Sequence, residues 1–241
     1  WNWGWSYVFG GRLWDGQGKI TITEPEAVRA YEWIAGYSKR YGPGELQTFR
    51  SGFGNFSSPQ NAFMDRKVAM VLQGVWMYNF INMYQPELRW AAAPFPHPAD
   101  RPDLAELTFA DMDILVIPRG ARHPKEAFEF IAYVQSQKAM EKLCLLQRKN
   151  SPLREVSQEF WDAHPNPYIR LFDRLSYSKN AVPPPKIGIW PEFQAELNNA
   201  FDNVMLLKLT PNEALSNVEA RMQPKMDQYL ARLKAREGRA R

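Results

Sequence analysis

Apolar residues recur at the three- and four-residue spacing of an α-helix in several stretches of the chain. The clearest stretch follows residues 23–26 (TEPE), a capping-box sequence with proline in the first turn, and stops at residues 42–44 (GPG). We expect its inward face to comprise Ala27, Ala30, Tyr31, Ile34 and Ser38. A second capping box at residues 210–213 (TPNE) predicts a helix that buries Ala214, Leu215, Val218 and Met222.

Three more helices are expected from other start signals. One begins at residues 58–59 (SP), after a glycine-rich loop, and ends near Asp65, and another carries Trp76 on its first turn. A third begins at residues 123–125 (HPK). Its predicted inward face comprises Ala127, Phe128, Ile131 and Val134.

Short apolar runs between these helices predict β-strands. The runs are residues 19–22, 68–72, 88–93 and 113–117. From about residue 137 onward the pattern is helical, with proline-rich loops between the helices. Strands that alternate with helices, without an internal repeat, predict an α/β fold with a helical C-terminal third.

The content of aromatic residues is high and adds a functional hint. Phe, Trp and Tyr make up 14% of the 241 residues, and nine residues are tryptophan. Hydrophobic and charged contents of 45% and 23% are ordinary for a folded globular protein. A tryptophan-rich core and a carbohydrate-binding site both account for the aromatic bias.

The net charge of +4 is concentrated at one end of the chain. Residues 231–241 contain five cations and one anion, so the rest of the chain balances at zero. A nucleic-acid groove needs cations spread through the fold, so nucleic acid is not an expected partner. We interpret the basic segment as the frayed end of a last helix, where cations suit the helix dipole.

Metal and redox chemistry have no support in the sequence. Cys144 is the sole cysteine, which excludes an intrachain disulfide, and its apolar surroundings are typical of a buried thiol. His97, His123 and His164 each neighbour a proline and share no metal-ligand spacing. We therefore expect no metal and no cofactor. No apolar run approaches the length of about 18 residues that a membrane span needs.

Residues 63–76 (FMDRKVAMVLQGVW) predict a strand that ends at Gly74 and a tryptophan beside a helix N-terminus. The segment resembles the F-x-x-G-K-x-A-M-x-x-x-G-x-W signature of extracellular solute-binding proteins that feed sugar ABC importers. Residues 65–66 replace the usual small residue before the lysine. Further pieces follow the same order as in that family: GG at 10–11, GKITI at 18–22, PFP at 94–96, IPRG at 117–120, HPKEAFEFI at 123–131 and TPNEAL at 210–215. Together they resemble the latter part of a family 1 extracellular solute-binding protein, the class that includes maltose-binding protein.

The resemblance implies a periplasmic-binding-protein-like fold, in which two α/β lobes hold the solute between them. It implies that residues 1–106 are a second-lobe portion, that residues 107–142 are a crossover strand and helix of the first lobe, and that residues 143–241 return to the second lobe. Most of the first lobe would then precede Trp1, unless the numbering simply starts where the retained protein starts. The crossover elements would need a neighbouring molecule, a swapped dimer or a further chain segment to bury their apolar faces.

A sugar site needs flat aromatic rings together with polar groups at the rim. Trp76 matches the family's G-x-W tryptophan, which commonly stacks on the sugar, although it would also serve as a cover over the strand–helix corner. At least one of Trp1 and Trp3 is expected to face the cleft. The other candidate ligand-binding residues are Asp111, Asp113 and Trp190, and the sequence FADMD departs from the glycine-rich loop usual there.

The resemblance implies a non-enzymatic substrate-binding component of an ABC importer. It would capture a carbohydrate, an oligosaccharide, in the periplasm or elsewhere outside the cytoplasm, and deliver it to a membrane permease; lipid anchoring stays open. One alternative is a binding protein for a polyamine or another cationic solute, with Asp111 and Trp76 holding the cation. A glycoside hydrolase is the other alternative. It would need paired carboxylates from Asp111, Asp113 and Glu192, and no catalytic motif surrounds them.

Overall fold

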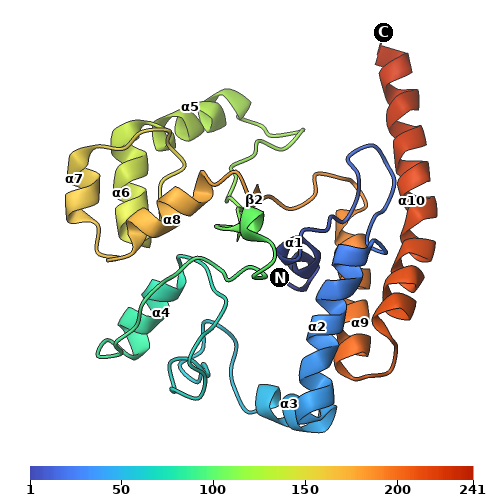
Figure 1. Cartoon of the computed structure of the whole chain (residues 1–241). Coiled ribbons are helices and arrows are strands. Elements are labelled where there is room, and N and C mark those ends of the chain that lie inside the picture. The colour runs from blue at the N-terminus through green and yellow to red at the C-terminus, as the bar shows by residue number, and fades with distance from the viewer. Residues whose placement is uncertain (241) are drawn as a thin grey trace. The chain divides into compact units, whose positions relative to one another are not determined.

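The computed structural model describes residues 1–240, and the chain divides into two compact units (Figure 1). Unit 1 comprises Trp1–Gly52, Pro96–Phe109 and the described part of Val182–Arg241. Unit 2 comprises Phe53–Phe95 and Ala110–Ala181. These boundaries differ from the ones expected at residues 106 and 142, and the assignment of segments to particular lobes stays a prediction.

Unit 1 is built around three long helices, α2 (Pro25–Tyr41), α9 (Trp190–Met205) and α10 (Pro211–Ala240), which pack against one another (Figure 1). Its shorter elements are η1 (Asn2–Gly4), α1 (Trp5–Val8), α3 (Pro43–Ser51), η2 (Pro102–Leu104) and β1 (Thr108–Phe109). The largest fully buried side chains of this unit include Leu13, Ile20, Ile22, Tyr31, Phe193, Leu197, Leu215, Met222 and Met226. Unit 1 therefore has a continuous helical core.

Helix α2 matches its predicted bounds but not its predicted cap. The five residues of its expected inward face are all buried, and it ends before Gly42, whose φ of +86° suits glycine. The capping box does not form, because Thr23 donates its hydroxyl to Glu219 and Glu24 occupies the N-cap without a side-chain bond. Beyond Gly42 the expected loop is instead helix α3, with Pro43 in its first turn.

Helix α10 forms the second capping box as predicted. The Thr210 amide donates to Glu213 Oε2 at 2.9 Å, and the Glu213 amide donates to Thr210 Oγ1 at 3.3 Å. All four predicted core residues of this helix are buried. The basic segment continues the helix to Ala240, and Arg241 lies outside the described residues.

Gln223 of α10 takes the place of a neighbouring strand for residues 18–20. Its Oε1 accepts from the Ile20 amide at 2.8 Å, and its Nε2 donates to the Gly18 carbonyl at 2.9 Å. The strand expected at residues 19–22 is otherwise reduced to a single antiparallel bridge between Trp14 and Ile20. A helix side chain thus satisfies backbone groups that a sheet would normally pair.

Unit 2 contains five helices among its described residues: α4 (Met77–Tyr84), α5 (Pro124–Val134), α6 (Gln137–Gln147), α7 (Gln158–Ala163) and α8 (Ile169–Ser176). Unit 2 contains two small hydrophobic cores. One gathers Met64, Met77 and Ile81, and the other gathers Met140, Cys144 and Phe160. Ser157 begins α7 by accepting from the Phe160 amide at 3.1 Å, and its own hydroxyl donates to Glu141 at 2.8 Å.

Three predicted strands of unit 2 are wrong for this chain. Residues 68–72, 88–93 and 113–117 are extended segments without strand pairing in the part that the structure describes, and residues 58–65 form turns instead of a helix. A strand needs backbone partners from another segment, and none is present for these three. Met70 and residues 114–116 are accordingly exposed, whereas Leu88 and Trp90 of the second segment pack against the core of Met64, Met77 and Ile81. The sheet that the described residues contain has two short strands, β1 and β2 (Ala181–Val182).

Helix α5 begins where the sequence predicted, but its predicted inward face is not buried. Phe128 is 64% exposed, and no residue of α5 is fully buried. The expectation that this face is buried is wrong for Phe128, whereas Val134 packs against the core of Met140, Cys144 and Phe160. The cause is the same lack of a covering segment.

Candidate functional site

Three of the predicted binding residues gather in unit 1 around a fourth aromatic residue, Phe109. The Trp1 and Phe109 rings are stacked, with centroids 5.7 Å apart and planes 22° apart. Trp3 meets Phe109 edge-on at 4.9 Å and Trp190 edge-on at 5.5 Å. Residues from η1, β1 and the start of α9 thus form one aromatic cluster.

The members of this cluster differ in exposure. Trp1 is 42% exposed, whereas Trp3 is only 4% exposed. Trp3 is thus a core residue of unit 1, and the expectation that one of these two tryptophans faces the cleft stays a prediction, for which Trp1 is the exposed candidate. Gly4, which follows Trp3, lies directly against the Phe109 ring, because a Cβ on Gly4 would be 2.3 Å from Cζ of Phe109.

Trp190 is the first residue of α9 and is half-buried. Its ring centroid lies 6.2 Å from that of Phe193, three residues further along the helix. Glu192, the carboxylate considered for a hydrolase, forms an ion pair of 2.5 Å with Lys225 of α10. That contact joins two packed helices. Glu192 therefore has a structural partner within unit 1.

Trp76 lies at the N-cap of α4 in unit 2, one residue before the helix that it was expected to begin. Its Nε1 donates to Gln73 Oε1 at 3.0 Å, and its ring covers Gly74, where a Cβ would lie 2.2 Å from the ring. The ring centroid of Phe56 lies 6.3 Å from that of Trp76. A larger residue at Gly74 would therefore displace the Trp76 ring from its present position.

Asp111 and Asp113 are both exposed in unit 2 and do not form a shared site there. Asp111 Oδ1 accepts from the adjacent Met112 amide at 2.8 Å. Asp113 pairs with Lys149 at 3.3 Å. Carboxylates in such positions can accept hydrogen bonds from a ligand, and one of the two already has a cationic partner.

The hydrogen bonds of His164 in unit 2 fix which of its ring nitrogens carries the proton. Its Nδ1 accepts from the Asn166 amide at 3.1 Å, so the ring proton must reside on Nε2, which lies 3.2 Å from the Lys149 carbonyl. Partial burial lowers the pKa of His164. This histidine links the end of α6 to the loop before α8, and it is not near a metal-binding group.

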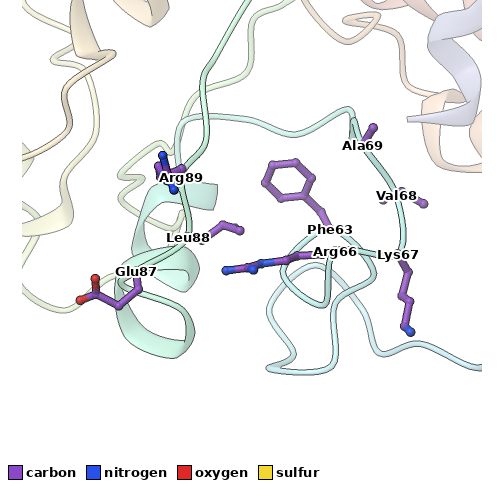
Figure 2. Close-up of a pocket in the computed structure, with 8 residues that line it drawn as sticks. All are labelled: Phe63, Arg66, Lys67, Val68, Ala69, Glu87, Leu88 and Arg89. Atoms are coloured by element: carbon purple, nitrogen blue, oxygen red, sulfur yellow. The ribbon is translucent and has the colours of Figure 1, made fainter.

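A pocket of about 520 Å³ lies in unit 2 between two of the extended segments (Figure 2). It is lined by Phe63, Arg66, Lys67, Val68, Ala69, Glu87, Leu88 and Arg89. Figure 2 shows Arg66 extending toward Leu88, whereas Lys67 points away from that residue. The cations do not converge on one point, and none of the predicted binding residues lines this pocket.

The described residues contain no group of three or more His, Cys, Asp and Glu side chains that could hold a metal ion. Burial raises the pKa of the Cys144 thiol, which suits an unreactive core cysteine. Over the part of the chain that the structure describes, no helix combines the length and apolar character needed to cross a membrane.

A family model described as "bacterial extracellular solute-binding protein" matches residues 2–167. The chain belongs to this family. The resemblance read from the sequence is therefore confirmed, and the location that the family description gives is outside the cell's cytoplasm.

Solved structures support the same conclusion for this solute-binding protein. CpMnBP1 with mannotriose bound is 25% identical, with a TM-score of 0.76 over 89% of this chain and 55% of that chain. CpMnBP1 with mannobiose bound is 26% identical, with a TM-score of 0.77 over 89% and 54%. An ABC transporter solute-binding protein from Thermotoga lettingae TMO, bound with α-D-tagatose, is 18% identical, with a TM-score of 0.65 over 93% and 55%. A search of curated proteins found no match to the chain.

The periplasmic-binding-protein-like fold is thus confirmed, and the solute-binding protein spans about half the length of the structures it matches. The predicted binding residues divide equally between the units, with Trp1, Trp3 and Trp190 in unit 1 and Trp76, Asp111 and Asp113 in unit 2. Their role in binding stays a prediction. The sequence pattern did not single out Phe109 or Gly4. Phe109 is a lone phenylalanine far along the chain from Trp1, so no local pattern connects the two residues.

Proposed function

We propose that the chain is part of the substrate-binding component of an ABC importer that captures a short oligosaccharide and delivers it to a membrane permease. The similarity to CpMnBP1 carries this proposal, because it extends over 89% of the chain and those structures hold mannotriose and mannobiose. Manno-oligosaccharides are therefore the first ligands to test.

The aromatic cluster of unit 1 supports a carbohydrate ligand. Exposed flat rings bind the apolar C–H faces of pyranoses, and polar rim groups bind the hydroxyls. Trp1 in unit 1 and Trp76 in unit 2 are the aromatic residues that we assign to the ligand. Asp111 and Asp113 are assigned to hydroxyl groups as charged acceptors.

The mechanism is binding without chemistry. The lobes of the complete protein close around the solute, and the closed form is recognised by the permease. Hydrolysis is disfavoured because Glu192 is paired with Lys225, and because the exposure of Asp111 and Asp113 leaves neither in the apolar surroundings that a general acid requires. Release of mannose or mannobiose from mannotriose by the full-length protein would overturn this part of the proposal.

Titration of the full-length protein with mannotriose and with spermidine, followed by tryptophan fluorescence and calorimetry, separates the two solute classes. We expect saturable binding of mannotriose and no saturable response to spermidine. A saturable response to spermidine alone would sink the carbohydrate proposal and support the polyamine alternative.

A matched pair of variants tests the site. Trp76→Ala is expected to weaken mannotriose binding at least about tenfold without lowering expression, since it removes a stacking ring. Trp161→Ala is the control, because Trp161 packs on Phe160 and lies under Arg170 of the same unit, outside the predicted site. Unchanged affinity in Trp76→Ala would show that Trp76 only covers Gly74.

A further inference from the structure

We propose that Phe109 is a positioning residue, which together with Gly4 holds the Trp1 ring as a platform for the apolar face of a sugar ring. The proposal rests on the carbohydrate-binding function proposed above. It names two residues that neither the family motif nor the sequence pattern singled out.

The stacked geometry of Trp1 and Phe109 is the first observation. Their planes are 22° apart with centroids at 5.7 Å, and Trp1 keeps 42% of its surface exposed. A ring backed by a second ring loses less conformational freedom when a ligand docks on it, and this preorganisation strengthens binding. Trp1 is thus the ligand-facing member and Phe109 the support.

Phe109 is itself contacted by a second tryptophan that belongs to the core of unit 1. Trp3, which is buried, meets its ring edge-on at 4.9 Å, and Trp190 in turn meets Trp3 edge-on at 5.5 Å. Edge-to-face pairs of this kind are directional. The support therefore connects the platform to the helical core of unit 1.

Gly4 shows that the space occupied by the Phe109 ring is specific. The backbone of Gly4 has φ −79° and ψ −16°, which any residue adopts, so glycine is not needed there for conformational freedom. A Cβ at this position would come within 2.3 Å of the Phe109 ring. An alanine at this position would therefore displace the Phe109 ring, which is the support.

The variants Gly4→Ala and Phe109→Leu test the proposal in the full-length protein. The ring centroids of Trp1 and Trp3 lie 6.1 Å apart with planes 40° apart, so their coupled absorption should contribute to the ligand-free circular-dichroism band. Trp5 and Trp33, 5.1 Å apart, also contribute, so the platform is read from the difference between variant and wild-type spectra. We expect both variants to diminish this band. We also expect both to bind mannotriose about two- to tenfold more weakly, the equivalent of one aromatic pair.

Two controls separate positioning from general damage. Gly36→Ala, on α2, places its Cβ in open space and should keep both the band and the affinity. Phe109→Tyr retains the ring and should restore the band relative to Phe109→Leu. If Gly4→Ala fails to fold, Phe109→Leu carries the test alone.

The readouts distinguish this proposal from the proposed function. If the wild-type protein binds no mannotriose, the function fails, and the ligand-free band still decides whether Phe109 positions Trp1. An unchanged band in Phe109→Leu would overturn the positioning role. A diminished band with wild-type mannotriose affinity would overturn the platform role.

Discussion

The inward faces of the long helices in unit 1 are covered by one another, whereas many apolar side chains in unit 2 are exposed to solvent. In unit 1, α2, α9 and α10 bury one another's inward faces. In unit 2, residues 114–116 and the Phe128 face of α5 have no cover among the described residues. Helices satisfy their backbone groups internally and need only side-chain partners, but extended segments also need backbone partners. Among the described residues, the helices of unit 1 find side-chain partners, whereas the extended segments 68–72, 88–93 and 113–117 of unit 2 find no strand partner.

A matched pair of phenylalanine substitutions gives the largest expected difference between the units. Phe193→Ala in α9 removes a side chain that is 0% exposed and should cost about 3–5 kcal/mol of unfolding free energy. Phe128→Ala in α5 removes one that is 64% exposed and should cost no more than about 0.5 kcal/mol. Urea denaturation followed by circular dichroism measures both. Equal costs would mean that the α5 face is buried in solution, which would break the comparison.

Helix caps offer a smaller and more local test, because each unit has one formed by a hydroxyl side chain. Thr210→Ala removes the capping box of α10, and Ser157→Ala removes the cap of α7, each at a cost of about 1 kcal/mol. If the units unfold separately, Thr210→Ala should lower only the transition of unit 1 and Ser157→Ala only that of unit 2. Calorimetric scans resolve this. A common shift in both variants would indicate that the two units unfold together.

The smallest expected effect is a pH dependence confined to unit 2. The pKa of His164 is lowered by burial, so between its folded value and about 6.5 the unfolded state binds more protons than the folded state. Stability should therefore fall as the pH drops below about 6.5. Protonation would also remove the acceptor that Nδ1 provides for the Asn166 amide.

His164→Asn isolates this effect, because the asparagine oxygen can replace Nδ1 as acceptor and does not titrate. The difference in unfolding free energy between pH 7.5 and pH 5.5 should be smaller in this variant than in the wild type. His97→Asn, at an exposed site in unit 1, is the control. A wild-type pH dependence retained in His164→Asn would assign the effect to other groups.

Local sequence signals predicted the parts of the fold that depend on neighbours along the chain. The inward face of α2 and the capping box at Thr210 follow from periodicity and from residues within one helical turn. Gly74 lies directly against the Trp76 ring two residues away, although the strand expected to end at this glycine does not form.

Predictions that depend on distant residues failed or were never made. Residues 68–72 have the apolar pattern of a strand, but strand formation requires partners that the described chain does not provide. The failed cap at Thr23 has a similar cause, since Glu219 on α10 binds its hydroxyl instead. Phe109 was missed because only the folded chain brings it onto Gly4 and Trp1.

The pairing of Gln223 with residues 18 and 20 has a consequence for how the protein is made. These bonds join residues more than two hundred positions apart, so unit 1 cannot complete its N-terminal turn until α10 has left the ribosome. Unit 2 lies wholly between residues 53 and 181 and can collapse earlier during synthesis. Unit 1 is therefore the last part of the chain to close, and its completion waits for the final helix.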